Sequence, residues 1–227
     1  HNMKKFGFIL FSLFAFAFFI FSCSSTKTFN IEINDIGTYP QPLIEPLPIK
    51  VGVYYGNDFG TFKTTQKVEF VGQDGASIFT YIDNIKMGKA NIALFDYILS
   101  TVFEKVTPVQ YLSKGSEHKK DIDLIVEPTV HSFTYLSPTN PPVPSAYGVI
   151  TIHIIYEINF YLPEGEKISS WSIKGSGAVL PMIELKHETT AVVELTQMAM
   201  RRVTAKFMTD FCNQVEIKKL FYSQCNQ

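Results

Sequence analysis

Apolar and polar residues alternate most regularly between positions 147 and 162. Every even position from 150 to 162 is apolar, whereas the odd positions include His153 and Glu157. This period of two predicts a long strand with one buried face and one wetter face. The proline and glycine of residues 163–166 then predict a hairpin turn, and residues 167–179 form its returning strand.

Shorter runs of the same kind predict the other strands. These runs cover residues 49–55, 62–71, 109–112 and 122–135, while residues 76–86 fit no single period. Pro128 has no N–H to donate, so its strand should lie at a sheet edge or contain a bulge at that point. Gly175-Ser176-Gly177, near the end of the last strand, predicts a bulge or a turn.

Two other segments repeat apolar residues every three or four positions, which predicts helices with one buried stripe. The first covers residues 89–105, and the second runs from Thr189 or Thr190 to Cys212. The inward stripe of the second contains Val192, Leu195, Ala199, Val203, Phe207 and Phe211. This order of elements predicts an α+β fold, with a mostly antiparallel sheet and both helices packed on one face.

The N-terminal segment has a different character. Lys4 and Lys5 precede an apolar run from Phe6 to Phe21. The run is shorter than the roughly 20 residues that span a bilayer, so residues 1–22 are predicted to be a signal peptide. Residues 1–2 precede the natural-looking start and are interpreted as a cloning scar. The alternatives are an uncleaved anchor or an ordinary cleaved signal with an incidental cysteine.

The end of that run, Ile20-Phe21-Ser22-Cys23, resembles the lipobox of bacterial lipoproteins, although Phe21 is bulkier than the usual residue. The resemblance implies cleavage before Cys23, a diacylglycerol on its sulfur and an acylated amino terminus. Two or more acyl chains hold a protein stably at a membrane. Ser24 and Ser25 place no acidic residue after the cysteine, which in the resembled family favours the outer membrane, with the protein facing the periplasm.

Residues 23–47 are polar and then rich in proline, and they predict an extended lipid-anchored tether. Residues 48–227 are then expected to form a single α+β domain. In the alternative, residues 29–36 pack on that domain as an irregular strand.

Charge and cysteine content narrow the partners. The formal net charge is −1 and becomes more negative when Lys4 and Lys5 leave with the signal. No basic excess remains to neutralise phosphates, which argues against nucleic acid as a partner. If Cys23 carries lipid, Cys212 and Cys225 remain as an even pair in an oxidising compartment, either bonded to each other or as two free thiols.

Candidate chemistry is sparse. Glu127 and His131 share one strand face, His153 and Glu157 share another, and a suitable register would bring the four together as metal ligands. The alternative is a solvated sheet face with ordinary cross-strand polar pairs. No nucleophile, P-loop or dinucleotide motif is present. We therefore predict no catalytic residue, metal or cofactor, and no enzymatic activity.

Aromatic residues gather beside the predicted loops. Tyr54, Tyr55 and Phe59 lie near the first turn, while Tyr135 and Tyr147 flank a proline-rich loop. Such residues either recognise peptides, glycans or proteins, or they cover the edges of the core.

The layout of residues 47–212 resembles a broad group of envelope lipoproteins. It has an opening strand, Met87-Gly88-Lys89-Ala90 before the first helix, and a strand that begins at residues 121–128. The group includes the N-terminal-domain type of the curli secretion lipoprotein and the lipoprotein activators of peptidoglycan synthases.

This resemblance implies a binding or assembly role in transport, secretion or wall assembly, with another envelope protein or complex as partner. One alternative is a lipid-anchored enzyme or metal-binding protein that uses the His/Glu residues. Another is a subunit of an oligomeric secretion pore, with residues 61–71 and 76–86 as its amphipathic hairpin.

Overall fold

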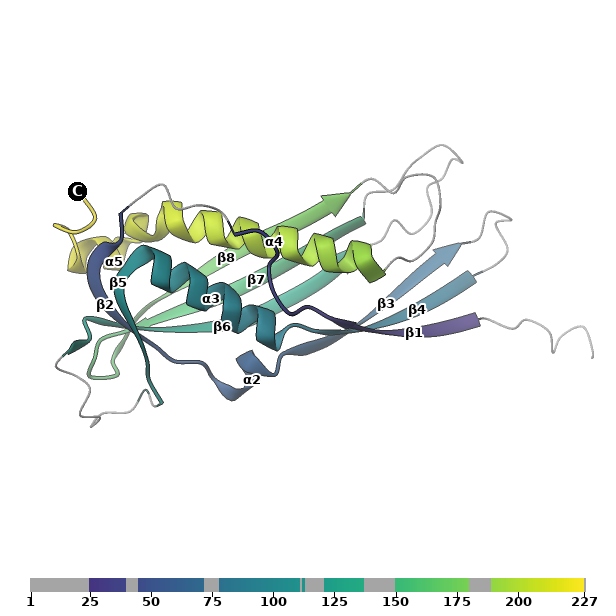
Figure 1. The fold of residues 1–227 in the computed structure, drawn as a ribbon, viewed down its shortest axis with the longest axis horizontal. Helices are drawn as coiled ribbons and strands as arrows, with labels where there is room; N and C mark the ends of the chain where they lie inside the picture. Colours follow the sequence, from purple (N-terminus) through teal and green to yellow (C-terminus); the bar gives the residue numbers. More distant parts are fainter. Residues whose placement is uncertain are drawn as a thin grey trace, which may run out of the picture.

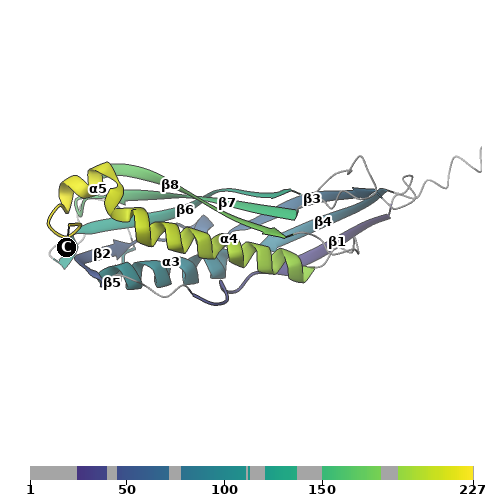
Figure 2. The same cartoon turned by 90° about the horizontal axis from the view of Figure 1, so that it is seen from above.

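The computed structural model describes residues 25–39, 45–71, 78–110, 112, 121–136, 150–179 and 189–226. Within them the protein is a long molecule built on two sheets (Figure 1). A larger sheet with two long helices makes up one end, and a smaller sheet extends from it to the other end (Figure 2).

The larger sheet has five strands in the order β5-β2-β6-β7-β8. Their bounds are β2 Leu47–Val53, β5 Phe103–Pro108, β6 Leu124–Leu136, β7 Ile150–Tyr161 and β8 Lys167–Val179. β6, β7 and β8 are antiparallel, whereas β2 runs parallel to both β5 and β6. The predicted α+β class is confirmed, but the sheet is mixed rather than mostly antiparallel. Parallel neighbours need a long crossover connection, and the whole chain between β2 and β5 provides it.

Helices α3 (Gly88–Val102) and α4 (Thr189–Asp210) lie side by side on one face of this sheet (Figure 2), as predicted. α3 ends at Val102 rather than at residue 105. The strand expected at residues 109–112 lies earlier in the chain, as β5 over Phe103–Pro108. Val106 continues the helical spacing of apolar residues, so the pattern alone does not show that Phe103 leaves the helix. Phe103 does so because it packs in the core, where its ring lies 4.9 Å from that of Phe211.

The smaller sheet has the order β1-β4-β3. Its strands are β1 Ser25–Glu32, β3 Lys63–Val71 and β4 Ile78–Lys86, with β1 parallel to β4 and β3 antiparallel to it. The prediction of a tether over residues 23–47 is therefore wrong for residues 25–36. Ile31, Ile33 and Ile36 are buried, and this apolar spacing is the reason that the segment packs on the domain.

Residues 33–39 then cross from the smaller sheet to the helices. Arg201 on α4 donates a 2.8 Å hydrogen bond to the carbonyl of Ile36, and Gln197 donates a 3.0 Å bond to the Asp35 carboxylate. The ring of Tyr39 lies 4.1 Å from that of Tyr97 on α3. These contacts join the two parts of the molecule into one body.

α4 packs directly on the backbone of β8. A Cβ atom on Gly175 would lie 2.0 Å from the carbonyl oxygen of Ala199, and one on Gly177 would lie 2.1 Å from that of Leu195. Gly175-Ser176-Gly177 is thus neither a bulge nor a turn, because β8 pairs with β7 in continuous register through these residues. The glycines are there to let the helix approach.

Two other sequence features have local explanations. Pro128 lies past the end of the β2–β6 ladder, whose last pair is Val53–Val126, so its missing N–H leaves no bond to β2 unmade. The turn at residues 163–166 closes with a 2.8 Å hydrogen bond from Leu162 to Glu166, and Gly165 supplies the positive φ of 86°.

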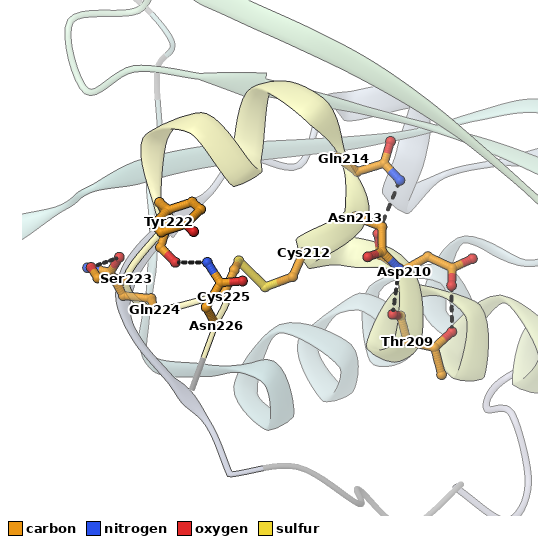
Figure 3. The surroundings of a disulfide bond; sticks show 10 residues. All are labelled: Thr209, Asp210, Cys212, Asn213, Gln214, Tyr222, Ser223, Gln224, Cys225 and Asn226. Atoms are coloured by element: carbon orange, nitrogen blue, oxygen red, sulfur yellow. Dashed lines mark hydrogen bonds between the residues drawn. A yellow bond between two sulfur atoms is a disulfide. The ribbon is translucent and has the colours of Figure 1, made fainter.

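Short helices complete the described fold. α2 (Asn57–Gly60) lies against α3. After α4 the chain forms a 3-10 turn, η2 (Phe211–Asn213), and then α5 (Val215–Leu220). Cys212 is bonded to Cys225 across this C-terminal segment (Figure 3).

Candidate functional site

Cys23 lies outside the described residues, but an ordered strand begins very soon after it. β1 starts at Ser25, so only Ser24 separates the cysteine from a hydrogen-bonded strand. The start of β1 lies at the far end of the smaller sheet, opposite the C-terminal end of the molecule (Figure 1). A lipid on Cys23 would therefore sit directly beside that end of the fold.

The four residues proposed as metal ligands are not brought together as one ligand set. His131 lies where the β6–β7 register shifts, with its Nδ1 atom 3.9 Å from a carboxylate oxygen of Glu157. His153 lies opposite Thr134 and away from that pair. Burial, and then the nearby charge of Lys174, lowers the pKa of His153. Among the residues that the structure describes, no three His, Cys, Asp or Glu side chains could hold a metal ion together.

Glu127 instead anchors a polar network on the open face of the larger sheet. Its carboxylate accepts a 2.6 Å hydrogen bond from the Tyr161 hydroxyl and a 3.1 Å bond from the Asn159 amide. Ser170 then donates a 2.8 Å bond to Asn159. Burial and the hydrogen bond to Glu127 raise the pKa of Tyr161. The network links β6, β7 and β8 side by side, and it was missed because it depends on a register that the sequence does not reveal.

Of the aromatic residues near the first turn, Phe59 belongs to the core and Tyr55 packs at its edge, whereas Tyr54 is partly exposed. The Tyr55 hydroxyl donates a 2.7 Å hydrogen bond to Asp96, and its ring stacks 5.5 Å from that of Phe59. Phe59 is buried and makes an edge contact with Phe95. Burial, followed by the bond to Asp96, raises the pKa of Tyr55. These residues are thus packed in place rather than held free for recognition.

The second aromatic group is only partly described, because Tyr147 lies outside the described residues. Tyr135 is half-buried near the end of β6. Burial, with a smaller contribution from Asp83, raises its pKa to about 12. Tyr135 therefore also belongs to the packed interior of this region.

A groove opens at the C-terminal end of the molecule, with a volume of about 460 Å³. Its walls come from the chain before β2, from the end of α4 and from the disulfide. The lining residues include Pro46, Leu47, Met208, Phe211, Cys212 and Cys225. Figure 3 shows the disulfide beneath α5 with Tyr222 beside it. This volume falls within the range of roughly 300–1,000 Å³ typical of binding sites.

Apolar side chains are exposed beside this groove. Val215 is 64% exposed, Leu220 47% and Tyr222 66%, although Ile217 on the same short helix is fully buried. α5 therefore uses one residue to attach to the core and presents others to the outside. No pattern in the sequence predicts this surface, because six helical residues are too few to show a period.

A smaller pocket of about 230 Å³ lies where the smaller sheet meets α3. Lys63, Lys86 and Lys89 line it together with Glu32. Lys63 and Lys86 are register partners, and Lys89 pairs with Glu32 at 3.1 Å. The pocket is locally positive, because three lysines and one glutamate line it. The opposed pair Lys63 and Lys86 carries like charges, which is unfavourable for the sheet.

None of the described helices is both long and apolar enough to cross a membrane. No protein-family model and no curated protein matches the chain. Several solved structures resemble it, including the following three. One is a homolog of neuraminyllactose-binding hemagglutinin from Helicobacter pylori, with a TM-score of 0.51 at 12% identity, covering 83% of this chain and 98% of that one.

The second is a DUF330 protein from Xanthomonas campestris, with a TM-score of 0.41 at 9% identity, covering 88% of this chain and 95% of that one. The third is a minor lipoprotein from Acinetobacter baumannii, with a TM-score of 0.41 at 8% identity, covering 73% and 91%. The Helicobacter protein shares the fold of this chain, and at 12% identity the likeness extends to the fold alone.

Proposed function

We propose that this protein is a non-catalytic lipoprotein of the bacterial envelope. Lipid on Cys23 would hold it at a membrane, most simply the outer membrane on its periplasmic side, and its C-terminal end would bind another envelope protein. The lipobox-like sequence Ile20-Phe21-Ser22-Cys23 supports the anchor. The observation that carries the binding role is the exposed apolar surface at the end of the molecule remote from β1 (Figure 1).

These exposed residues, Val215, Leu220 and Tyr222, belong to α5 and the turn after it, the segment that leads to Gln224 and Cys225 in the wall of the groove. Protein interfaces combine an apolar, often aromatic centre with a polar rim. Lys218 and Lys219 on the solvent side of α5 supply such a rim, with Lys219 paired to Glu216 at 3.1 Å. Exposed apolar residues gathered in one short segment suit a contact surface, whereas apolar residues scattered singly over a surface need no explanation.

The arrangement of the polar residues favours binding over catalysis. On the open face of the larger sheet the Tyr161 hydroxyl, whose pKa is raised by burial, donates a 2.6 Å hydrogen bond to Glu127. A carboxylate that accepts two hydrogen bonds from the neighbouring strand serves to hold β6 and β7 together, which supports a structural role for Glu127.

The Helicobacter protein is described as a homolog of a neuraminyllactose-binding hemagglutinin. Neuraminic acid carries a carboxylate. The open face of the larger sheet in this chain has Glu127 and Glu157 at its centre, and these would repel an acidic sugar. The open sheet face is therefore unsuited to such a sugar, and the partner proposed for the C-terminal end remains a protein.

Site-specific photo-crosslinking in intact cells tests the proposal. A photoreactive amino acid replaces Val215 or Tyr222 in one set of strains, and Ser172, an exposed residue of β8, in the control. We expect a discrete heavier adduct with another envelope protein at positions 215 and 222, and none at position 172. Equal labelling at all three positions would contradict a dedicated surface. An adduct between two copies of this chain would favour the oligomeric pore subunit instead.

A further inference from the structure

The outer end of the smaller sheet is set by the register of three strands. Ser25 at the start of β1 lies opposite Phe79 on β4, and Phe79 lies opposite Phe70 on β3. The last pair of the β3–β4 ladder is Val71–Ile78. The first residue of β1 and the last described pair of the β3–β4 ladder are therefore level with one another, at the same extremity of the molecule (Figure 2).

The link from this extremity to Cys23 is very short. Two residues of fully extended chain span at most about 7 Å. The interfacial layer on each side of a bilayer is about 5–8 Å thick, the difference between a hydrocarbon core of about 30 Å and a total thickness of about 40–45 Å. A diacylglycerol on Cys23 has its acyl chains in the hydrocarbon, so Ser25 cannot lie far outside the headgroups.

β1 does not lengthen this link. All eight residues from Ser25 to Glu32 are in register with β4, and the chain then continues through buried Ile33 and Ile36. Releasing β1 would expose Ile31 as well, which costs about 1.5–3 kcal/mol for each fully buried aliphatic side chain. β1 therefore stays paired with β4, and the outer end of the β3–β4 ladder is held at the level of the proposed lipid on Cys23.

Residue types at this end suit that location. The last two register pairs, Phe70–Phe79 and Val71–Ile78, are aromatic and aliphatic, whereas the described positions nearer the body of the sheet include the exposed Lys63, Thr65 and Lys67. Tryptophan and tyrosine are enriched where proteins meet the membrane interface, and phenylalanine is buried at the same boundary by helices that lie on a membrane. Lys67 pairs with Glu69 at 2.7 Å, and the exposed Lys27 on β1 lies opposite Tyr81 of β4.

From the short link, the paired strand and the apolar end of the ladder, we infer that the outer end of the smaller sheet lies in the headgroup layer of the membrane that holds the protein. This inference rests on the lipid anchor of the proposed function. The C-terminal surface is then presented at the opposite end, away from the bilayer. The contact is imposed by the short link and does not depend on anionic lipid.

Tryptophan quenching by lipid tests this orientation on the full lipidated protein in phosphatidylcholine vesicles. Some of the lipid carries a headgroup spin label. Phe79→Trp and Val71→Trp place reporters at the proposed contact, and Tyr222→Trp, at an exposed position of the opposite end, is the matched control. The natural Trp171 is the single tryptophan of the chain and is nearly buried in β8, so the unsubstituted protein gives the background.

We expect strong quenching for Phe79→Trp and Val71→Trp, and background quenching for Tyr222→Trp. Ten glycine and serine residues inserted between Ser24 and Ser25 would add a reach of about 17 Å and should lower the quenching of Phe79→Trp toward the control. Unchanged quenching after the insertion would show that the link does not impose the contact.

Flotation of the same vesicles separates the two proposals. If the protein floats with the vesicles but positions 71 and 79 are quenched no more than position 222, the orientation is wrong and the lipid anchor stands. If the lipidated preparation does not float, the anchor is wrong and the orientation falls with it.

Discussion

At the scale of single residues, glycine and tyrosine show how closely the helix layer fits the larger sheet. Gly175 and Gly177 leave no room for a side chain beneath α4, and Tyr156 is a fully buried residue whose hydroxyl needs a partner inside the core. The Tyr156 hydroxyl donates a 2.7 Å hydrogen bond to Asn91 on α3. Both features lead to measurable stability effects.

Gly177→Ala is expected to destabilise the protein by about 2–3 kcal/mol, the upper range for overpacking a tight core. The alanine Cβ would lie 2.1 Å from the carbonyl oxygen of Leu195. This oxygen belongs to the backbone of α4, which cannot move aside as the end of a flexible side chain can. Urea unfolding followed by circular dichroism measures the change. Gly56→Ala is the control, because nothing lies within 4 Å of the position that its Cβ would take and its φ is −60°. Equal losses for both variants would contradict the close packing of α4 on β8.

Tyr156→Phe tests a buried hydroxyl and its pH dependence. Removing the donor leaves the side-chain amide oxygen (Oδ1) of Asn91 without this hydrogen bond, which should cost about 1–3 kcal/mol at neutral pH. Burial raises the pKa of Tyr156 above its ordinary value of 10.0. The folded protein therefore keeps this proton while the unfolded chain loses it, and the stability due to Tyr156 is fully present below pH 10 and is lost as pH rises.

At about pH 11 the unfolded state of the natural protein gains roughly 1.4 kcal/mol from ionising this one residue. The variant has no ionisable group at position 156. The difference in the free energy of unfolding between the two proteins should therefore narrow by about 1.4 kcal/mol between neutral pH and about pH 11. Urea unfolding at the two pH values measures it. A difference that stays constant with pH would show that Tyr156 is not buried in the folded state.

At the scale of elements, β1 is the part of the fold where sequence reasoning went furthest wrong. The prolines after residue 39 and the polar residues around Ser25 indicated a tether, and this outweighed the spacing of Ile31, Ile33 and Ile36. A parallel edge strand is difficult to recognise from its sequence, because its partner, here β4, lies about fifty residues away and was itself ambiguous.

The elements predicted well are those whose pattern is long and local. β7 alternates over its whole length, and the even positions of its described residues are buried from Ile152 to Phe160. The inward stripe of α4, from Val192 to Phe207, is buried as predicted. Features set by distant pairing, such as the Glu127–Tyr161 bond and the groove beside Cys225, could not be predicted, because each needs a register or a docking contact that no local pattern encodes.

Ile33→Ala tests whether β1 and the residues after it belong to the core. We expect a loss of about 2–4 kcal/mol, typical of removing a buried aliphatic side chain, because Ile33 is only 1% exposed. Asn34→Ala, at the exposed neighbouring position, should change the stability by no more than about 0.5 kcal/mol. Urea unfolding of both variants provides the measurement. If Ile33→Ala left the free energy of unfolding unchanged, the prediction that residues 25–36 belong to an extended tether would be favoured again.

The C-terminal segment should depend on its disulfide. The bond joins residues 13 positions apart, and closing a loop of about this length stabilises a fold by about 3 kcal/mol. In the double variant Cys212→Ser and Cys225→Ser, hydrogen exchange is expected to accelerate over α5 while the middle of α4 stays protected. Equal acceleration over α4 would mean that the bond supports the whole domain rather than its C-terminal end.

At the scale of the whole molecule, the start of β1, next to the proposed anchor, and the exposed apolar residues of the C-terminal segment lie at opposite ends of one body (Figure 1). The residues 33–39 that cross from β1 to α4 join these ends through Arg201 and Gln197. A partner bound at the C-terminal end would thus be held at a defined height above the membrane. A flexible tether would not hold it so, since its reach would vary with every conformation.

The proposed orientation, with the C-terminal end held away from the membrane, depends on lipid at Cys23. The substitution of Cys23 is therefore the broadest prediction. Cys23→Ser removes the sulfur that would carry the diacylglycerol, and a protein without its acyl chains loses about 0.8 kcal/mol for each methylene no longer buried in lipid. We expect the variant to lose incorporated labelled palmitate. Membrane retention does not report on the lipid, since the apolar run from Phe6 to Phe21 can itself hold an uncleaved chain at the membrane. Ser24→Asp is the matched control, because it keeps the cysteine while altering the adjacent residue; it should keep its palmitate label. Labelling of Cys23→Ser equal to that of the natural protein would contradict the lipid anchor and, with it, the placement of the smaller sheet at the headgroups.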